Sequence, residues 1–229
     1  MAHLGRNRVL LGFLGGSIAC FLTVGFVNSL PGVTSNVGLI LSYGAIWIPL
    51  GLGIMFAASA GPMRSIWSDL GLRFRPTDLL WGLSTGILLR VMASLFSVLV
   101  TGQLPAETVR FALPAHDAWW VFGAVVAPVL IAPVIEELFF RGLGLRYLLD
   151  PDRRIAPRFD KVAVVLVSSV AFTLLHLTEA NSPTQAIVTG LSIITFAVTT
   201  SILSVMTRRL SGTLIAHVVF NIGALTQTP

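Results

Sequence analysis

Seven apolar runs, each about as long as a helix that crosses a bilayer, constrain the fold of this chain more than any other feature. They lie at residues 9–28, 37–60, 79–101, 118–149, 162–180, 184–207 and 211–227. A bilayer core requires about 20 predominantly apolar helical residues. Only 11% of the 229 residues are charged, against about 25% in soluble domains. The sequence therefore predicts an all-α, polytopic membrane helix bundle with about seven transmembrane helices.

Basic residues concentrate at every second connection between these runs. They occur before the first run, at 61–78, at 150–161 and at Arg208–Arg209. Because such residues stay on the cytoplasmic side, we expect a cytoplasmic N-terminus. The same rule accounts for the net charge of +5, which therefore does not indicate nucleic acid as a partner. Arg6 and Arg8 resemble the start of a signal peptide, but the run after them is long and lacks a cleavage motif, so we expect an uncleaved helix.

The connection at 61–78 has the pattern of a short interfacial helix. Its apolar residues recur at helical spacing: Met63, Ile66, Trp67 and Leu70. We expect this segment to lie on the cytoplasmic surface, with Pro76 ending it and Asp78 capping the next helix. We divide the chain into an N-terminal part, 1–117, and a C-terminal core, 118–229.

The fourth run contains ionisable residues that are costly in a bilayer. Such groups are usually paired, turned to the protein interior and functional. Glu137 and Arg141 are four residues apart and are expected to form an ion pair, whereas Glu136 is rotated by about 100° from Glu137. The two adjacent acids can therefore have two different roles. Pro128 and Pro133 lie in the same run, and each removes a backbone hydrogen-bond donor. The prolines could produce a kink that opens the helix wall beside the acids. Alternatively, they are ordinary prolines of a membrane helix.

Two later runs offer complementary polar groups. Phe172 and His176 share a face of the fifth run, and His217 and Asn221 share a face of the seventh. At ~1.5 Å per residue, Glu136 and His176 both lie about 20 Å from the 150–161 connection. We therefore expect these two side chains to meet inside the membrane.

This set of residues is suited to peptide hydrolysis without a serine or cysteine nucleophile. Glu136 beside a neutral His176 can take a proton from water, and His217 and Asn221 carry donors for an oxyanion. Alternatively, Glu136, His176 and His217 could ligate zinc, which would activate its own water. The sequence leaves both routes open and predicts no other cofactor. The expected partners are membrane lipids and a membrane-associated protein or peptide substrate.

The ordered motifs resemble those of the CPBP family of intramembrane proteases. Glu136-Glu137-x-x-x-Arg141, Phe172-x-x-x-His176 and His217-x-x-x-Asn221 follow one another on separate runs, and the resemblance covers about residues 118–226. This family includes type II CAAX prenyl endopeptidases and bacteriocin-processing or immunity proteins. The resemblance implies that Glu136 and His176 activate water, that His217 and Asn221 form the oxyanion site, and that Glu137 and Arg141 support them. It also implies an integral membrane protein, which we expect in a prokaryotic cell membrane.

Two other classes of function share some of these features. A non-catalytic immunity or scaffold protein would keep the fold, and a proton-coupled transporter would use a similar relay, although no inverted repeat is visible. Arg90, midway along the third run, could pair with Glu136 or Glu137, bind a substrate carboxylate, or have the structural role that we favour.

Overall fold

A computed structural model describes residues 6–31, 35–59, 70–104, 117–145 and 161–225, and their regular structure is helical throughout. Six helices are α1 (Arg6–Ser29), α2 (Ser35–Ala58), α4 (Thr77–Thr101), α8 (Lys161–Leu177), α9 (Pro183–Thr207) and α10 (Ser211–Leu225). A seventh, continuous helix consists of α5 (Ala118–Trp120), η1 (Val121–Ile131), α6 (Ala132–Glu136) and η2 (Glu137–Leu145), and we call it the central rod. The predicted all-α bundle is confirmed.

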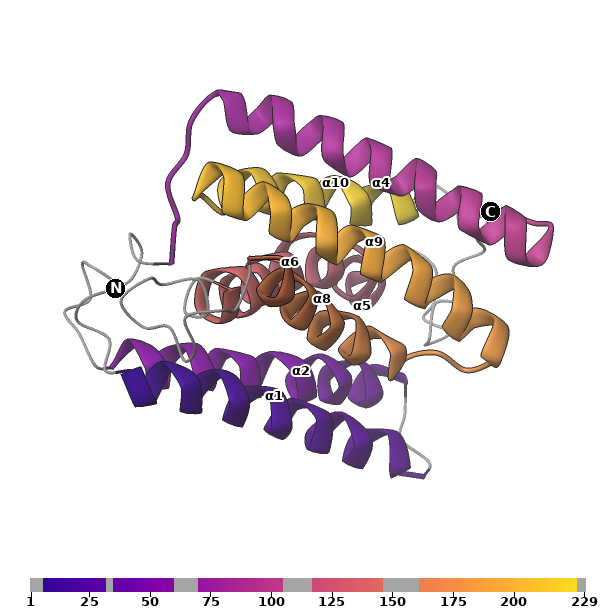
Figure 1. Ribbon diagram of the computed structural model, residues 1–229. Coiled ribbons are helices and arrows are strands. Elements are labelled where there is room, and N and C mark those ends of the chain that lie inside the picture. Colours follow the sequence, from indigo (N-terminus) through magenta and orange to yellow (C-terminus); the bar gives the residue numbers. More distant parts are fainter. Residues whose placement is uncertain (1–5, 32–34, 60–69, 105–116, 146–160, 226–229) are drawn as a thin grey trace.

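The helices form layers around the central rod (Figure 1). α1 and α2 lie side by side on one side of the rod and α8, while α9, α10 and α4 cover the other. Five of the described helices are long and apolar enough to cross a membrane, and α8 and α10 are shorter apolar helices. Large apolar side chains such as Leu22, Met55 and Leu99 are exposed on the outside of the bundle, as expected where lipid is the solvent. The cytoplasmic position of the N-terminus stays a prediction.

The connection before α4 differs from the sequence prediction. Residues 61–69 of the predicted interfacial helix lie outside the described residues, and residues 70–76 form turns and irregular chain. The predicted helix cap by Asp78 is wrong, because α4 has no side-chain cap at its N-terminus. The Asp78 carboxylate instead accepts the backbone N–H of Arg75 at 2.9 Å and the guanidinium of Arg209 at 2.6 Å. A charged donor binds a carboxylate more strongly than a neutral N–H does, so the ion pair determines where this side chain points.

The central rod is wound more widely than an α-helix along much of its length. In η1 and η2 the backbone follows π-helical i→i+5 bonding, and the N–H of Ala132 donates to the carbonyl of Ala127. π-helical turns are rare and occur frequently at functional sites. Here they flank α6, whose last residue is Glu136.

The i→i+5 register explains how the rod tolerates two prolines. Pro128 and Pro133 lack the N–H groups that would bond the carbonyls of Gly123 and Pro128. The hydroxyl of Tyr43 on α2 donates to the Gly123 carbonyl at 2.6 Å, and the amide of Asn221 on α10 donates to the Pro128 carbonyl at 2.7 Å. Both freed acceptors are therefore satisfied by side chains from neighbouring helices, as an apolar environment requires.

Two glycines one turn apart let α4 approach α10 closely. A Cβ atom on Gly82 would lie 2.5 Å from the Cβ of Ile215. A Cβ on Gly86 would lie 2.7 Å from the carbonyl oxygen of Ala216 and 2.7 Å from the Cβ of Val219. Small residues four apart are a common helix contact in membranes. The contact joins the two parts into which the sequence was divided, and the 117/118 division stays a prediction.

Replacing Gly86 by alanine should destabilise the bundle, because the added methyl group cannot fit without separating α4 from α10. We expect a loss of about 1–3 kcal/mol, as for other overpacked sites, measured by denaturant unfolding in detergent. The control is Gly25→Ala on α1, where an added Cβ meets nothing within 4 Å. Equal stability of the two variants would contradict the close contact.

Candidate active site

The charged residues of the fourth run lie inside the bundle, as the sequence predicts. Glu136, Glu137 and Arg141 are all buried, and Arg141 Nη1 lies 3.2 Å from Glu137 Oε1, which confirms the predicted pair. The Arg141 guanidinium also donates to the hydroxyl of Thr200 on α9 at 2.9 Å. Its Cζ lies 4.2 Å from the ring centroid of Phe172, a favourable cation–π arrangement. The arginine thus joins the central rod to α8 and α9.

His217 of α10 binds the other side of Glu137. Its Nδ1 lies 3.1 Å from Glu137 Oε1. Because an ionised carboxylate only accepts, Nδ1 carries the hydrogen of this bond. Neutral His217 then directs the lone pair of Nε2 toward Glu136, whose Oε2 is 3.8 Å away.

His176 of α8 approaches Glu136 in the same way. Its Nδ1–H donates to the backbone carbonyl of Phe172 at 2.9 Å, which leaves Nε2 as an acceptor. This Nε2 lies 3.7 Å from Glu136 Oε2. The expected meeting of Glu136 and His176 is confirmed.

Glu136 Oε2 lies between the Nε2 atoms of His176 and His217, at distances too long for direct hydrogen bonds. This oxygen is buried and has no hydrogen-bond partner among the described residues. A gap of this length between two acceptors suits a water molecule that donates one hydrogen to each. The arrangement can therefore orient and deprotonate water.

Charge neutrality limits the protonation states of this cluster. The charges of Glu137 and Arg141 cancel each other, and an unpaired charge in an apolar interior is costly. One proton is therefore shared by Glu136 and the two histidines, whose Nε2 atoms lie 3.7 and 3.8 Å from Glu136 Oε2. A shared proton allows the same residues to act as base and then as acid.

Asn221 faces the central rod on the same side of α10 as His217. Its amide donates one hydrogen to the Pro128 carbonyl. A side-chain amide has two hydrogens, so the second can serve another acceptor. The shared face of His217 and Asn221 is as predicted, but Asn221 also has the backbone role described above.

The residues considered from the sequence as zinc ligands are Glu136, His176 and His217. Among the described residues, no group of three or more His, Cys, Asp and Glu side chains could hold a metal ion. Glu136 Oε2 lies 3.7 Å from His176 Nε2 and 3.8 Å from His217 Nε2. We therefore derive no step through a metal.

Three contributors to the site were not found from the sequence. Thr200 and Phe196 of α9 contact Arg141, and the Phe196 ring also lies 4.7 Å from the His217 ring. These two residues are four apart, the spacing of the other motifs, which is the signal that could have revealed them. Tyr43, which donates to the Gly123 carbonyl, is not part of a motif with this spacing.

Arg90 lies on α4 against α10. Its Cζ is 5.7 Å from the centroid of the Phe220 ring, and its side-chain carbons lie next to Gly223. This packing agrees with the structural role that we favoured, and the role itself stays a prediction.

The fold and the site define a polytopic helical membrane protein with a buried glutamate–histidine centre. Residues 118–223 match the family model described as type II CAAX prenyl endopeptidase Rce1-like. The match agrees with the resemblance found in the sequence, and the matched segment contains all six predicted site residues. The match supports a CAAX-type intramembrane protease at the family level, a class whose substrate is a membrane-associated peptide. The comparisons with curated proteins and with solved structures gave no match.

Removing only the arginine of the buried pair should lower the unfolding free energy far more than removing both charges. Arg141→Met leaves Glu137 uncompensated, which should cost about 3–5 kcal/mol of unfolding free energy. Adding Glu137→Gln should recover a large part of this loss, as measured by denaturant unfolding in detergent. Strictly additive effects of the two substitutions would show that the charges are not coupled.

Proposed function

We propose that the protein is an intramembrane endopeptidase that hydrolyses a peptide bond of a membrane-associated protein or peptide. The observation that supports this most directly is the 3.7 Å separation of two hydrogen-bond acceptors, Glu136 Oε2 and His176 Nε2. A water held there donates to both atoms and keeps a lone pair for attack on a carbonyl carbon.

The reaction requires two proton transfers. Glu136 takes a proton from the water, the water oxygen bonds to the scissile carbonyl carbon, and the carbonyl oxygen becomes an oxyanion. Glu136 or His176 then gives a proton to the amide nitrogen, and the carbon–nitrogen bond breaks to yield a carboxyl group and an amine. The proton given to the amide nitrogen replaces the one taken from the water, so the cluster returns to its starting protonation state.

His217 and Asn221 are the donors that we assign to the oxyanion. When His217 carries the shared proton, its Nε2–H becomes a donor, while its Nδ1–H keeps the hydrogen bond to Glu137. Asn221 supplies the amide hydrogen that is not bonded to Pro128. Preorganised donors of this kind are worth roughly 10²–10³ in rate.

Glu137 and Arg141 act as positioning residues in this proposal. Both side chains are fully buried, so they do not meet a substrate. Glu137 fixes the His217 ring, and Arg141 fixes Glu137 through contacts to α8 and α9.

Access to the centre is most open at His176. Its side chain is 22% exposed, against 8% for Glu136 and 5% for His217. His176 is also in the last turn of α8. A peptide would therefore approach the water from the α8 side of the central rod.

Replacing the water-activating residues should abolish cleavage while the protein remains folded. We expect Glu136→Gln and His176→Ala each to lower the rate by about 10²–10⁴-fold, the usual contribution of a general base. New protein termini in membranes of producing cells, identified by mass spectrometry, provide the measurement. Glu107→Gln, the same chemical change outside the motifs, is the control.

The same experiment separates the protease from a non-catalytic immunity or scaffold protein. If the new termini are identical in cells producing the wild type, Glu136→Gln and His176→Ala, the proposed catalysis is wrong. A peptide that crosslinks to the Glu136→Gln protein would identify the substrate.

Activity should persist after metal removal, because the proposed route needs only protein side chains and water. The measurement is the rate of cleavage by the purified protein after dialysis against a strong chelator, with a dialysed sample without chelator as the control. A loss of activity that zinc restores would favour the metal route instead.

A further inference from the structure

One further carboxylate lies at the open side of the candidate active site. Glu179 belongs to the short connection between α8 and α9, three residues beyond His176. Glu179 is exposed, whereas the six residues of the predicted site are buried or half-buried. None of the steps proposed for hydrolysis uses this carboxylate.

The backbone after α8 turns Glu179 to the same side of the chain as His176. The N–H groups of Thr178, Glu179 and Ala180 donate to the carbonyls three residues earlier, at 3.3, 3.2 and 3.2 Å. Side chains three residues apart eclipse each other in this tighter 3₁₀ winding. Glu179 therefore lies one turn beyond His176, on the face that His176 directs toward Glu136.

The charge of Glu179 acts on residues of two other helices. Its carboxylate interacts electrostatically with Glu136 of the central rod and with the buried Cys20 of α1. Its effect on Glu136 is larger than that of Glu137, the next residue of the rod. Because such interactions weaken with distance and with screening by solvent, Glu179 lies on the side of α8 that faces the rod and α1.

A peptide that reaches the catalytic water has to pass near this carboxylate. The His176 side chain is 22% exposed and lies in the last turn of α8, next to Glu179. Behind it, Glu136 Oε2 is buried and has no hydrogen-bond partner among the described residues. The scissile carbonyl must approach that oxygen, so the residues beside the scissile bond come within electrostatic range of Glu179.

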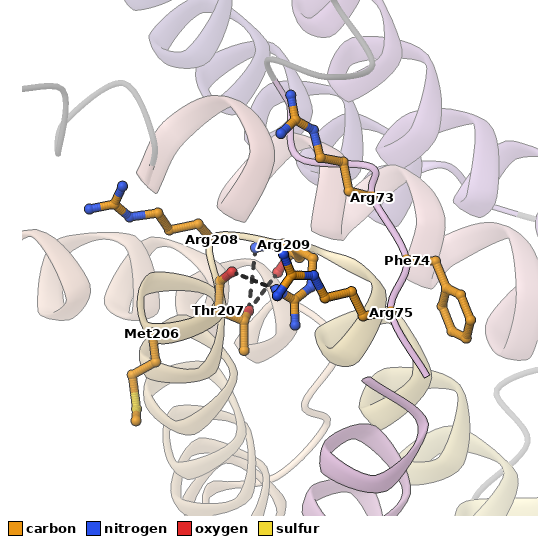
Figure 2. A pocket seen from close by; sticks show the side chains of 7 residues that line it. All are labelled: Arg73, Phe74, Arg75, Met206, Thr207, Arg208 and Arg209. Carbon is orange, nitrogen blue, oxygen red and sulfur yellow. Dashed lines mark hydrogen bonds between the residues drawn. The ribbon is translucent and has the colours of Figure 1, made fainter. Parts of the chain in front are cut away.

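Among the described residues, no cation pairs with Glu179. The charges of Glu137 and Arg141 cancel each other, and Arg90 packs on α4 against α10. Four arginines line a pocket at the other end of α9 (Figure 2), and α9 is roughly 36 Å long at ~1.5 Å per residue. The described part of the entrance therefore carries an excess of negative charge.

We propose that Glu179 is a specificity-determining residue that selects peptides with a lysine or arginine close to the scissile bond. This inference rests on the proposed proteolytic function and names a class of substrate for it. A cationic side chain is attracted to the entrance, where the neighbouring apolar medium strengthens the interaction. An acidic side chain or a free C-terminal carboxylate at the same place is repelled. Glu179 thus affects which peptides bind, while Glu136 and His176 activate the water.

Competition within a peptide library tests this preference in the full-length protein. The purified protein, in a non-ionic detergent, is incubated with a synthetic library of random-sequence peptides, and mass spectrometry identifies the cleaved bonds. We expect bonds flanked by lysine or arginine to be cleaved roughly tenfold more often than bonds flanked by aspartate or glutamate. Glu179→Gln should remove this preference, Glu179→Asp should keep it, and Glu179→Lys should reverse it.

A matched control distinguishes the local charge from the total charge of the protein. Asp160→Asn removes one negative charge from the residue before α8, at the opposite end of that helix from Glu179, and should keep the preference. An equal loss of preference in Asp160→Asn would overturn the proposal. An equal fall in the cleavage of all peptides in Glu179→Gln and Glu179→Lys, with the preference intact, would show a structural role instead.

A binding measurement separates this inference from the proposed catalysis. The Glu136→Gln protein, with and without Glu179→Gln, captures peptides from the same library, and the lysine and arginine content of the bound peptides is compared. We expect cationic peptides to be enriched only when Glu179 is present. Cleavage that is absent from the wild type, or that persists in Glu136→Gln, would contradict the proposed hydrolysis. A charge preference that is missing, or that is unchanged by Glu179→Gln, would overturn the role of Glu179 alone.

Discussion

The buried pair of Glu137 and Arg141 is the interaction on which the rest of the structure depends. Neither charge contacts solvent, and each has further partners on other helices. Through these partners the central rod is joined to α8, α9 and α10, and the His217 ring is fixed beside Glu136. Burying an ion pair seldom increases stability over apolar packing, so we interpret the pair as the means of setting helix positions and side-chain orientation. Glu136, without such a partner, is left available for chemistry.

Side chains from neighbouring helices also bond the backbone of the central rod. A proline in a membrane helix leaves an acceptor with no water to bind. Tyr43 and Asn221 supply the missing donors from two different helices. The rod therefore combines an unusual winding next to the acids with side-chain hydrogen bonds to both carbonyls that its prolines leave open. Asn221 takes part both in this backbone contact and in the proposed oxyanion site.

The sequence predicted the helices, their order and the residues that gather at the centre. Apolar run length and loop charge are local signals, and i,i+4 spacing fixes which side chains share a face, so Glu137–Arg141 and Phe172–His176 could be inferred directly. Contacts between helices depend on their tilt and rotation, which no local pattern contains. Tyr43 was missed for this reason, whereas Phe196 and Thr200 had a local signal in their spacing that was not used. Asp78 was assigned to its own helix when its partner is Arg209, which lies 131 residues away. The i→i+5 winding was also not predicted, because the two prolines indicated a kink as readily as a wider helix.

The contacts of the central rod determine which parts of the bundle can move during a catalytic cycle. Tyr43 and Asn221 hold its backbone on opposite sides, and Phe139 fills the space left by Gly16 and Gly53 of α1 and α2. Rotation or sliding of the rod would break both carbonyl bonds in a medium that offers no replacement. α8 and α9, in contrast, are joined by a short connection at 178–182. Because His176 lies in the last turn of α8, next to this connection, a peptide would enter beside it, with the rod acting as a fixed support for Glu136.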